Sequence, residues 1–259
     1  MRCVDGAPAD LGACWRQISA CGEGRASARG RPLRGVSQNI SEIANSSQTA
    51  IRTYVRHNLS DDLISELIRA EDDGDRLTHD ELVNLVAILL NAGTETTRNQ
   101  LAAAVEVLSE HQDQWALLAE HPELAPKAVE ELMRHSPIVF ASLRVATTDI
   151  ELDDVLIPAG AFVLANTAAA NRDPAVYDHP DRLDITREGP APMLTFGGGA
   201  HYCLGAHLAR VELAEALRVI TAKMSNARRT GPAPWKPITE LSGPTTLPIE
   251  FTGRVASLR

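Results

Sequence analysis

The stretch 196–205, Phe-Gly-Gly-Gly-Ala-His-Tyr-Cys-Leu-Gly, constrains the fold of this chain most, because it places one thiol in a glycine-rich turn directly before a helical pattern. Gly197 and its two successors permit the positive φ of a tight turn, and Gly205 leaves space beside the sulfur. Residues 204–221 then carry apolar side chains at a helical period. Cys203 is therefore predicted at a helix N-terminus, where the dipole favours a thiolate.

A lone cysteine is often a small buried hydrophobic residue. The glycines on both sides of Cys203 argue against that interpretation, because no side chain crowds the approach to the sulfur. We expect a thiol that a flat group or another backbone can reach.

Composition narrows the class of partner. The chain has 259 residues, enough for one large core or two modest domains, and its net charge of -9 argues against a nucleic-acid face. It contains no run of about 18 apolar residues and no apolar leader, so a soluble protein is expected. Three of its four cysteines, Cys3, Cys14 and Cys21, lie in one irregular segment, which favours a reducing, cytoplasmic setting with free thiols.

The chain divides by pattern into two parts. Residues 1–36 contain six Gly and six Arg without hydrophobic periodicity, which predicts an irregular, poorly packed segment. Residues 37–259 read as mainly α with a small β portion. Helices are expected at 40–55, after Ser60, at 80–110, at 115–119, at 127–135 and at 204–221, with short strands between 139 and 166 and a terminal hairpin from 241–247 and 249–251.

The longest predicted helix begins after Thr78-His-Asp-Glu81, which has the form of a capping box. Its middle reads Ala92-Gly-Thr-Glu-Thr-Thr97, and Gly93 costs a helix about 1 kcal/mol relative to alanine. Taken alone, Gly93 indicates a tolerated kink or a close helix crossing.

Glu131 and Arg134 are three residues apart and share a helix face. Such a pair is common and, when exposed, is worth only about 0 to 1 kcal/mol. Arg144 lies among the predicted strands, and Arg172 and Arg182 could brace the turn-rich connection that precedes the glycine loop.

With their spacing, Phe196, Gly199, His201, Cys203 and Gly205 resemble the haem-binding signature of the cytochrome P450 family, the haem-thiolate monooxygenases of the bacterial type. Ala92 to Thr96 resembles the oxygen-binding segment of that family's long central helix, and Glu131 with Arg134 resembles its buried Glu-x-x-Arg pair. The resemblance covers residues 37–259 and only the later, C-terminal part of the family fold.

The resemblance implies haem b (iron protoporphyrin IX), with Cys203 as proximal iron ligand and Phe196 packed near the sulfur. It further implies that His201 and Arg144 bond the haem propionates and that Gly199 and Gly205 shape the loop. Ala92 and Gly93 would flank the space above the iron, Glu95 and Thr96 would support proton delivery, and Glu131 with Arg134 would hold the segment that leads to the loop.

The implied activity is insertion of one oxygen atom from O2 into a small organic substrate, with electrons from a ferredoxin/reductase-type donor and with no nucleic acid or membrane as partner. The alternative is a truncated remnant without turnover, because the family's earlier helices have no counterpart in residues 1–36. A zinc site at His201, Cys203 and His207 is disfavoured, since no further pair closes a tetrahedron. A phosphate loop is also disfavoured, because no Gly-Lys-Ser/Thr follows the glycines.

Overall fold

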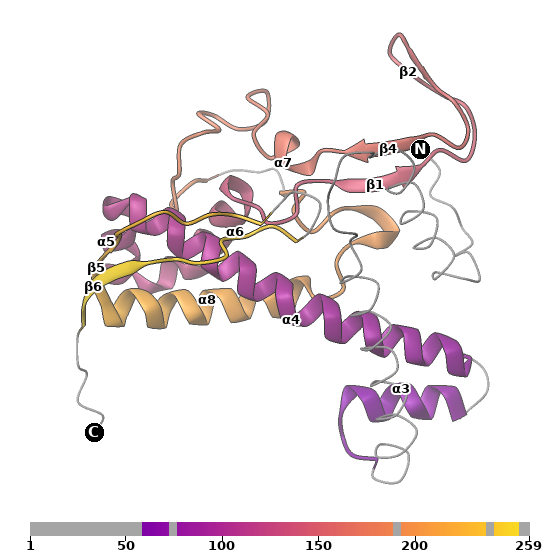
Figure 1. The fold of residues 1–259 in the computed structure, drawn as a ribbon, viewed down its shortest axis with the longest axis horizontal. Helices are drawn as coiled ribbons and strands as arrows, with labels where there is room; N and C mark the ends of the chain where they lie inside the picture. The colour runs from indigo at the N-terminus through magenta and orange to yellow at the C-terminus, as the bar shows by residue number, and fades with distance from the viewer. Residues whose placement is uncertain (1–58, 73–76, 189–192, 237–240, 254–259) are drawn as a thin grey trace, which may run out of the picture. The chain divides into compact units, whose positions relative to one another are not determined.

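The structure is a computed structural model that describes residues 59–72, 77–188, 193–236 and 241–253. The expectations for residues 1–36, including Cys3, Cys14 and Cys21, and for a helix at 40–55 lie outside these ranges. The elements follow the order α3 (Leu63–Asp72), α4 (His79–Glu110), α5 (Gln112–Glu120), η2 (Pro122–Leu124), α6 (Ala125–His135), β1 (Ser142–Val145), β2 (Ile150–Leu152), β3 (Val155–Ile157), β4 (Phe162–Ala165), α7 (Thr167–Ala170), η3 (Gly199–His201), α8 (Ala206–Lys223), β5 (Met224–Arg229) and β6 (Ile249–Gly253) (Figure 1).

The chain forms two compact units, residues 1–92 and 93–259, and the long helix α4 passes from the first into the second. In the first unit, Ile68 of α3 packs with Leu82, Val83 and Val86 of α4 in a small apolar cluster. No helix in the ranges that the structure describes is long and apolar enough to cross a membrane.

Helix α4 begins as the capping box predicts. The Glu81 carboxylate accepts a hydrogen bond from the Thr78 backbone N–H at 2.8 Å, and Glu81 N–H donates to the Thr78 hydroxyl at 3.3 Å. Two of the backbone donors that a helix start leaves unsatisfied are thereby bonded. The resulting helix has 32 residues, about 48 Å at 1.5 Å per residue.

The core of the second unit is helical. Apolar side chains from the C-terminal half of α4 pack with α5, α6 and α8, among them Leu108, Leu118, Leu132 and Leu217, each at most 1% exposed. Figure 1 shows α8 running beside α6. This core fixes the start of α8, and with it the position of the glycine loop that precedes the helix.

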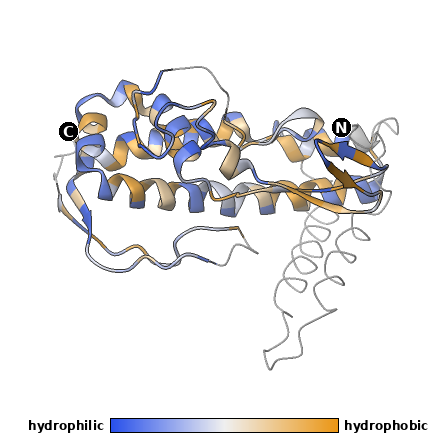
Figure 2. Cartoon of the chain, turned by 90° about the horizontal axis from the view of Figure 1, so that it is seen from above, coloured by the Kyte–Doolittle hydropathy of each residue, from blue (hydrophilic) through white to orange (hydrophobic). Residues whose placement is uncertain are grey.

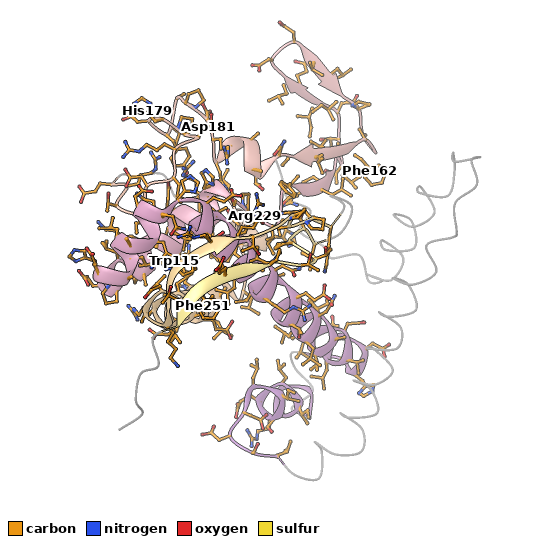
Figure 3. The ribbon with its side chains drawn as sticks, turned by 60° about the vertical axis from the view of Figure 1, so that its left-hand side comes forward. Trp115, Phe162, His179, Asp181, Arg229 and Phe251 are labelled. Carbon is orange, nitrogen blue, oxygen red and sulfur yellow. The ribbon has the colours of Figure 1, made fainter. Side chains whose placement is uncertain are left out.

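Among its described residues, the second unit also has three two-stranded antiparallel sheets: β1 with β4, β2 with β3, and β5 with β6. The predicted pairing of 241–247 with 249–251 is wrong, because β6 pairs instead with β5, which directly follows α8. The Trp115 indole donates to Met224 O at 3.0 Å and Arg229 contacts Glu106 at 2.8 Å, which ties β5 to α5 and α4 (Figure 3). The polar sequence of β5, Met-Ser-Asn-Ala-Arg-Arg, gives no strand signal.

Candidate functional site

The loop around Cys203 is closed by its own backbone. Cys203 N–H donates to Phe196 O at 3.0 Å, and Tyr202 N–H donates to Gly199 O at 3.0 Å. Gly197 and Gly199 have φ of +74° and +71°, the left-handed region that residues with a Cβ seldom occupy. The glycines therefore allow the chain to turn back so that the two ends of the loop bond each other.

The thiol of Cys203 is exposed, so the interpretation as a buried hydrophobic residue is wrong. A Cβ added at Gly198, Gly199 or Gly205 would meet no atom within 4 Å. The next side chain, Leu204, is 79% exposed. The loop thus presents one sulfur on an open face bordered by an apolar side chain.

A buried ion pair lies beneath the loop. Arg134 donates to Glu131 through Nε at 2.7 Å and through Nη2 at 2.9 Å, and the two side chains are 2% and 4% exposed. Arg187 lies on the other side of the same carboxylate, with Nε 3.1 Å from Oε2. Two guanidinium groups thus share one buried carboxylate, a pattern of charge-assisted bonds that holds its partners in fixed geometry.

Two further contacts connect this network to the loop. Arg134 Nη1 donates to Asn171 O at 3.0 Å. The Asn171 side chain accepts from Leu194 N–H at 2.7 Å and donates to the Thr195 hydroxyl at 2.9 Å. Thr195 directly precedes Phe196. The buried ion pair, acting through Asn171, therefore fixes the segment that leads into the glycine loop.

The sequence suggested Arg172 and Arg182 as braces, and the structure confirms this for Arg172 but not for Arg182. Arg187 is the residue of this connection whose side chain contacts Glu131. The Arg182 side chain is instead 68% exposed. Arg172 donates to His135 O at 2.6 Å and contacts the exposed carboxylate of Asp181. The loops around His179 and Asp181 lie at one edge of the second unit (Figure 3). Nothing in the sequence distinguishes Arg187, whose side chain is 18% exposed, from its neighbours as the one that reaches Glu131.

On α4, a Cβ at Gly93 would meet nothing within 4 Å, so close helix packing does not explain this glycine. Ala92 beside it is exposed, and Thr96 is half-buried. Glu95 forms an exposed ion pair with Arg98 at 3.7 Å. One turn further, Asn99 is 5% exposed, packs under the left-handed Gly243, and has an amide nitrogen without a partner.

The remaining predicted residues lie on separate elements of the second unit. Arg144 is a half-buried residue of β1, and one of its guanidinium nitrogens donates to Leu143 O at 2.9 Å. His201 ends η3 and is exposed.

The family model that matches this chain is described as cytochrome P450 and covers residues 31–221, which include α4, the Glu131 network and the Cys203 loop. The chain belongs to the cytochrome P450 family. The family predicted from the sequence is therefore confirmed, as is the mainly α fold with small sheets.

The chain is 44% identical over 192 residues to luteothin monooxygenase of Streptomyces thioluteus, covering 74% of this chain and 47% of that protein. It is 45% identical over 201 residues to nocardicin C N-oxygenase of Nocardia uniformis subsp. tsuyamanensis, covering 76% and 50%. The crystal structure of HinD with NMFT and NO matches with a TM-score of 0.78 at 36% identity, over 86% of this chain and 57% of that one. The chain spans about half the length of the curated relatives it matches.

Membership of the cytochrome P450 family implies haem, and the residues present fit that group. In the part of the chain that the structure describes, no three His, Cys, Asp or Glu side chains are placed to hold a metal ion. Cys203 would hold the iron of a bound haem, and the open glycine face and exposed Leu204 suit a flat apolar group.

Proposed function

We propose that this cytochrome P450 chain carries the haem-thiolate half of a monooxygenase, with haem b held by Cys203. The observation that carries the proposal is the accessible thiol in a self-bonded glycine loop, whose entry is fixed by the buried Glu131–Arg134 pair. The protein therefore holds the Cys203 sulfur in position before any cofactor binds, and such preorganisation is typical of functional sites.

The loop residues would orient the cofactor. The His201 imidazole and the Arg144 guanidinium would donate hydrogen bonds to its propionates. A guanidinium can bind a carboxylate through two parallel hydrogen bonds. Gly199 and Gly205 leave the approach to Cys203 open, and Phe196 covers the inner side of the loop. Bound haem supplies the oxygen-activating redox chemistry, and its thiolate ligand favours O–O cleavage.

Residues of α4 would move the protons. The hydroxyl of Thr96 and the carboxylate of Glu95 lie in successive positions of the helix, with Ala92 and Gly93 one turn earlier. A carboxylate next to a hydroxyl can pass protons one at a time from solvent, which Glu95 reaches, into a site that otherwise excludes water. The space at Gly93 is where O2 would be admitted.

The substrate would be a small organic molecule, and the electrons would come from a ferredoxin/reductase-type donor in the cytoplasm. The names of two relatives support this class, since luteothin monooxygenase and nocardicin C N-oxygenase are each named for the oxygenation of one compound. One matched structure, P450BioI, holds its fatty acid on an acyl carrier protein, so a carrier-bound substrate is part of the same proposal.

A second function is favoured by a separate observation. Apolar side chains on α8 are exposed, with Leu208 at 62% and Val211 at 60%. The corresponding proposal is a remnant that binds haem weakly or not at all and does not turn over.

One spectroscopic experiment separates these functions. The chain is purified with haem supplied, reduced and exposed to carbon monoxide, and the red-shifted Soret band of thiolate ligation is measured. We expect the band in the wild type and its loss in Cys203→Ala. Absence of the band from the wild type favours the remnant, and its survival in Cys203→Ala contradicts the ligand assignment.

Variants of the other residues test their roles. Thr96→Ala should keep the band but consume electrons without forming product, because proton delivery no longer accompanies oxygen reduction. His201→Ala should lose haem to an acceptor protein faster than the wild type. His207→Ala is the matched control, since His207 is also exposed and lies four residues after Cys203. Equal haem loss from the two histidine variants would contradict the role of His201.

A further inference from the structure

Arg210, on the second turn of α8, reaches back to both sides of the Cys203 loop. Its guanidinium carbon lies 4.5 Å from the centroid of the Phe196 ring, within the range of a cation–π contact. Nη1 donates to the Tyr202 hydroxyl at 3.1 Å. The Phe196 and Tyr202 rings contact each other edge-on, with centroids 6.3 Å apart. One side chain thus contacts both aromatic residues of the loop.

The other side of the same guanidinium is anchored on α6. Nε donates to one carboxylate oxygen of Glu130, and Nη2 lies 3.3 Å from the other. The Glu130 carboxylate, together with the Tyr202 hydroxyl, raises the pKa of Arg210. Arg210 is therefore held in its charged form, and it joins α8 and α6 to the loop.

These contacts lie at the two ends of the hydrogen bond that closes the loop. Phe196 supplies the carbonyl that accepts from Cys203 N–H, and Tyr202 directly precedes Cys203. Fixing the two rings restricts the backbone on both sides of this bond. A lysine could not do so, because a stack and a fork of three donors need a planar guanidinium.

We propose that Arg210 is a positioning residue for Cys203, which holds the thiol in the orientation of a metal ligand by clamping Phe196 and Tyr202 against Glu130. The clamp itself is a property of the protein without cofactor. Its consequence for haem ligation rests on the function proposed above.

The first test uses hydrogen exchange in the haem-free chain. In Arg210→Gln and in Arg210→Lys, the amides of 197–203 should exchange about tenfold faster than in the wild type, the effect expected when a charged hydrogen bond is lost. Arg218→Gln is the matched control, because Arg218 lies on the same helix and bonds Pro122 O and Glu215 away from the loop. It should leave exchange in the loop unchanged.

The second test uses the reduced carbon monoxide complex after haem is supplied. In both Arg210 variants a smaller fraction of bound haem should show the red-shifted thiolate band, whereas Arg218→Gln should match the wild type. Failure of lysine to restore the band distinguishes positioning by the planar group from an effect of charge alone. Full restoration by lysine would overturn the proposed clamp.

If hydrogen exchange in the loop of Arg210→Gln equals that of the wild type, the proposal is also overturned.

If Arg210→Gln loosens the whole fold, as shown by fast hydrogen exchange on the buried face of α8, the variant Tyr202→Phe decides instead. It removes a single acceptor, and it should speed exchange in the loop alone by a few-fold; no change would count against the clamp. A wild type without the thiolate band would refute the proposed function, while the exchange results would still decide the role of Arg210.

Discussion

The thiol of Cys203 is exposed although cysteine is among the residue types most often buried in proteins. The reason lies in its neighbours, since Gly198, Gly199 and Gly205 leave open space where a Cβ would stand. At the scale of single residues, access to the sulfur therefore depends on glycines, which have no side chain to block it. The glycine spacing contains this information, which is why the sequence predicted an accessible thiol.

His135, at the end of α6, is a residue whose charge state affects folding. Burial is the main cause that lowers its pKa, and the nearby Arg172 guanidinium lowers it further. Its ring nitrogens lie 3.0 Å from the Ser136 hydroxyl and 3.2 Å from Asp181 O. The folded protein therefore favours neutral His135 more than the unfolded chain does.

Because its pKa is lowered by folding, His135 contributes stability that is present above the unfolded pKa of about 6.5 and is lost as the pH falls toward the folded value. The free energy of unfolding, measured in urea, should thus decrease between about pH 7 and pH 5. In His135→Gln this decrease should be smaller, and in the exposed control His207→Gln it should match the wild type. A His135→Gln variant with the full wild-type decrease would contradict this.

At the scale of elements, the buried pair on α6 organises the segments that surround the loop. Glu131 accepts from Arg134, from Arg187 and, at 3.0 Å, from Asp184 N–H. Arg134 in turn bonds the carbonyls of Asn171 and, at 2.7 Å, Pro180. The described residues between α7 and η3 form no strand or helix, so these bonds define their path.

Glu131→Gln should destabilise the protein by about 3 to 5 kcal/mol, because it leaves the buried Arg134 guanidinium without a counter-charge. Glu188→Gln is the matched control, since Glu188 is 88% exposed and faces Lys127 at 3.6 Å. It should change the urea midpoint by the equivalent of less than about 1 kcal/mol. Equal midpoints for the two variants would show that the network does not stabilise the fold.

At the scale of the whole molecule, apolar side chains occupy two faces of α8. Leu213 and Leu217 are buried in the helical core, whereas Leu208 and Val211 are 62% and 60% exposed, as is Leu204 just before the helix at 79%. Strand β4 also has an exposed apolar side chain, Leu164 at 66%, and Figure 2 shows hydrophobic and hydrophilic colours side by side in the strands. Surfaces of this kind usually mark a site of interaction. We expect bound haem to cover the apolar side chains beside Cys203.

Haem binding should therefore raise the thermal unfolding midpoint of the chain. A ligand that binds only the folded state at a hundredfold excess over its Kd adds about 2.7 kcal/mol of stability. Cys203→Ala should show a clearly smaller rise, while Thr96→Ala, which alters no haem contact, should match the wild type. No rise in the wild type would favour the remnant over the enzyme.

The sequence by itself determined the family, the capped long helix, the strands β2 and β3 and the cysteine loop, because each follows from local spacing of a few residue types. Only the tertiary structure decided which arginine reaches the buried Glu131 and which strand pairs with β6. It also brought Arg210 onto Phe196, with Glu130 eighty positions away along the chain. Such contacts join segments far apart in the sequence, so they depend on how the helices pack, and no local pattern encodes them.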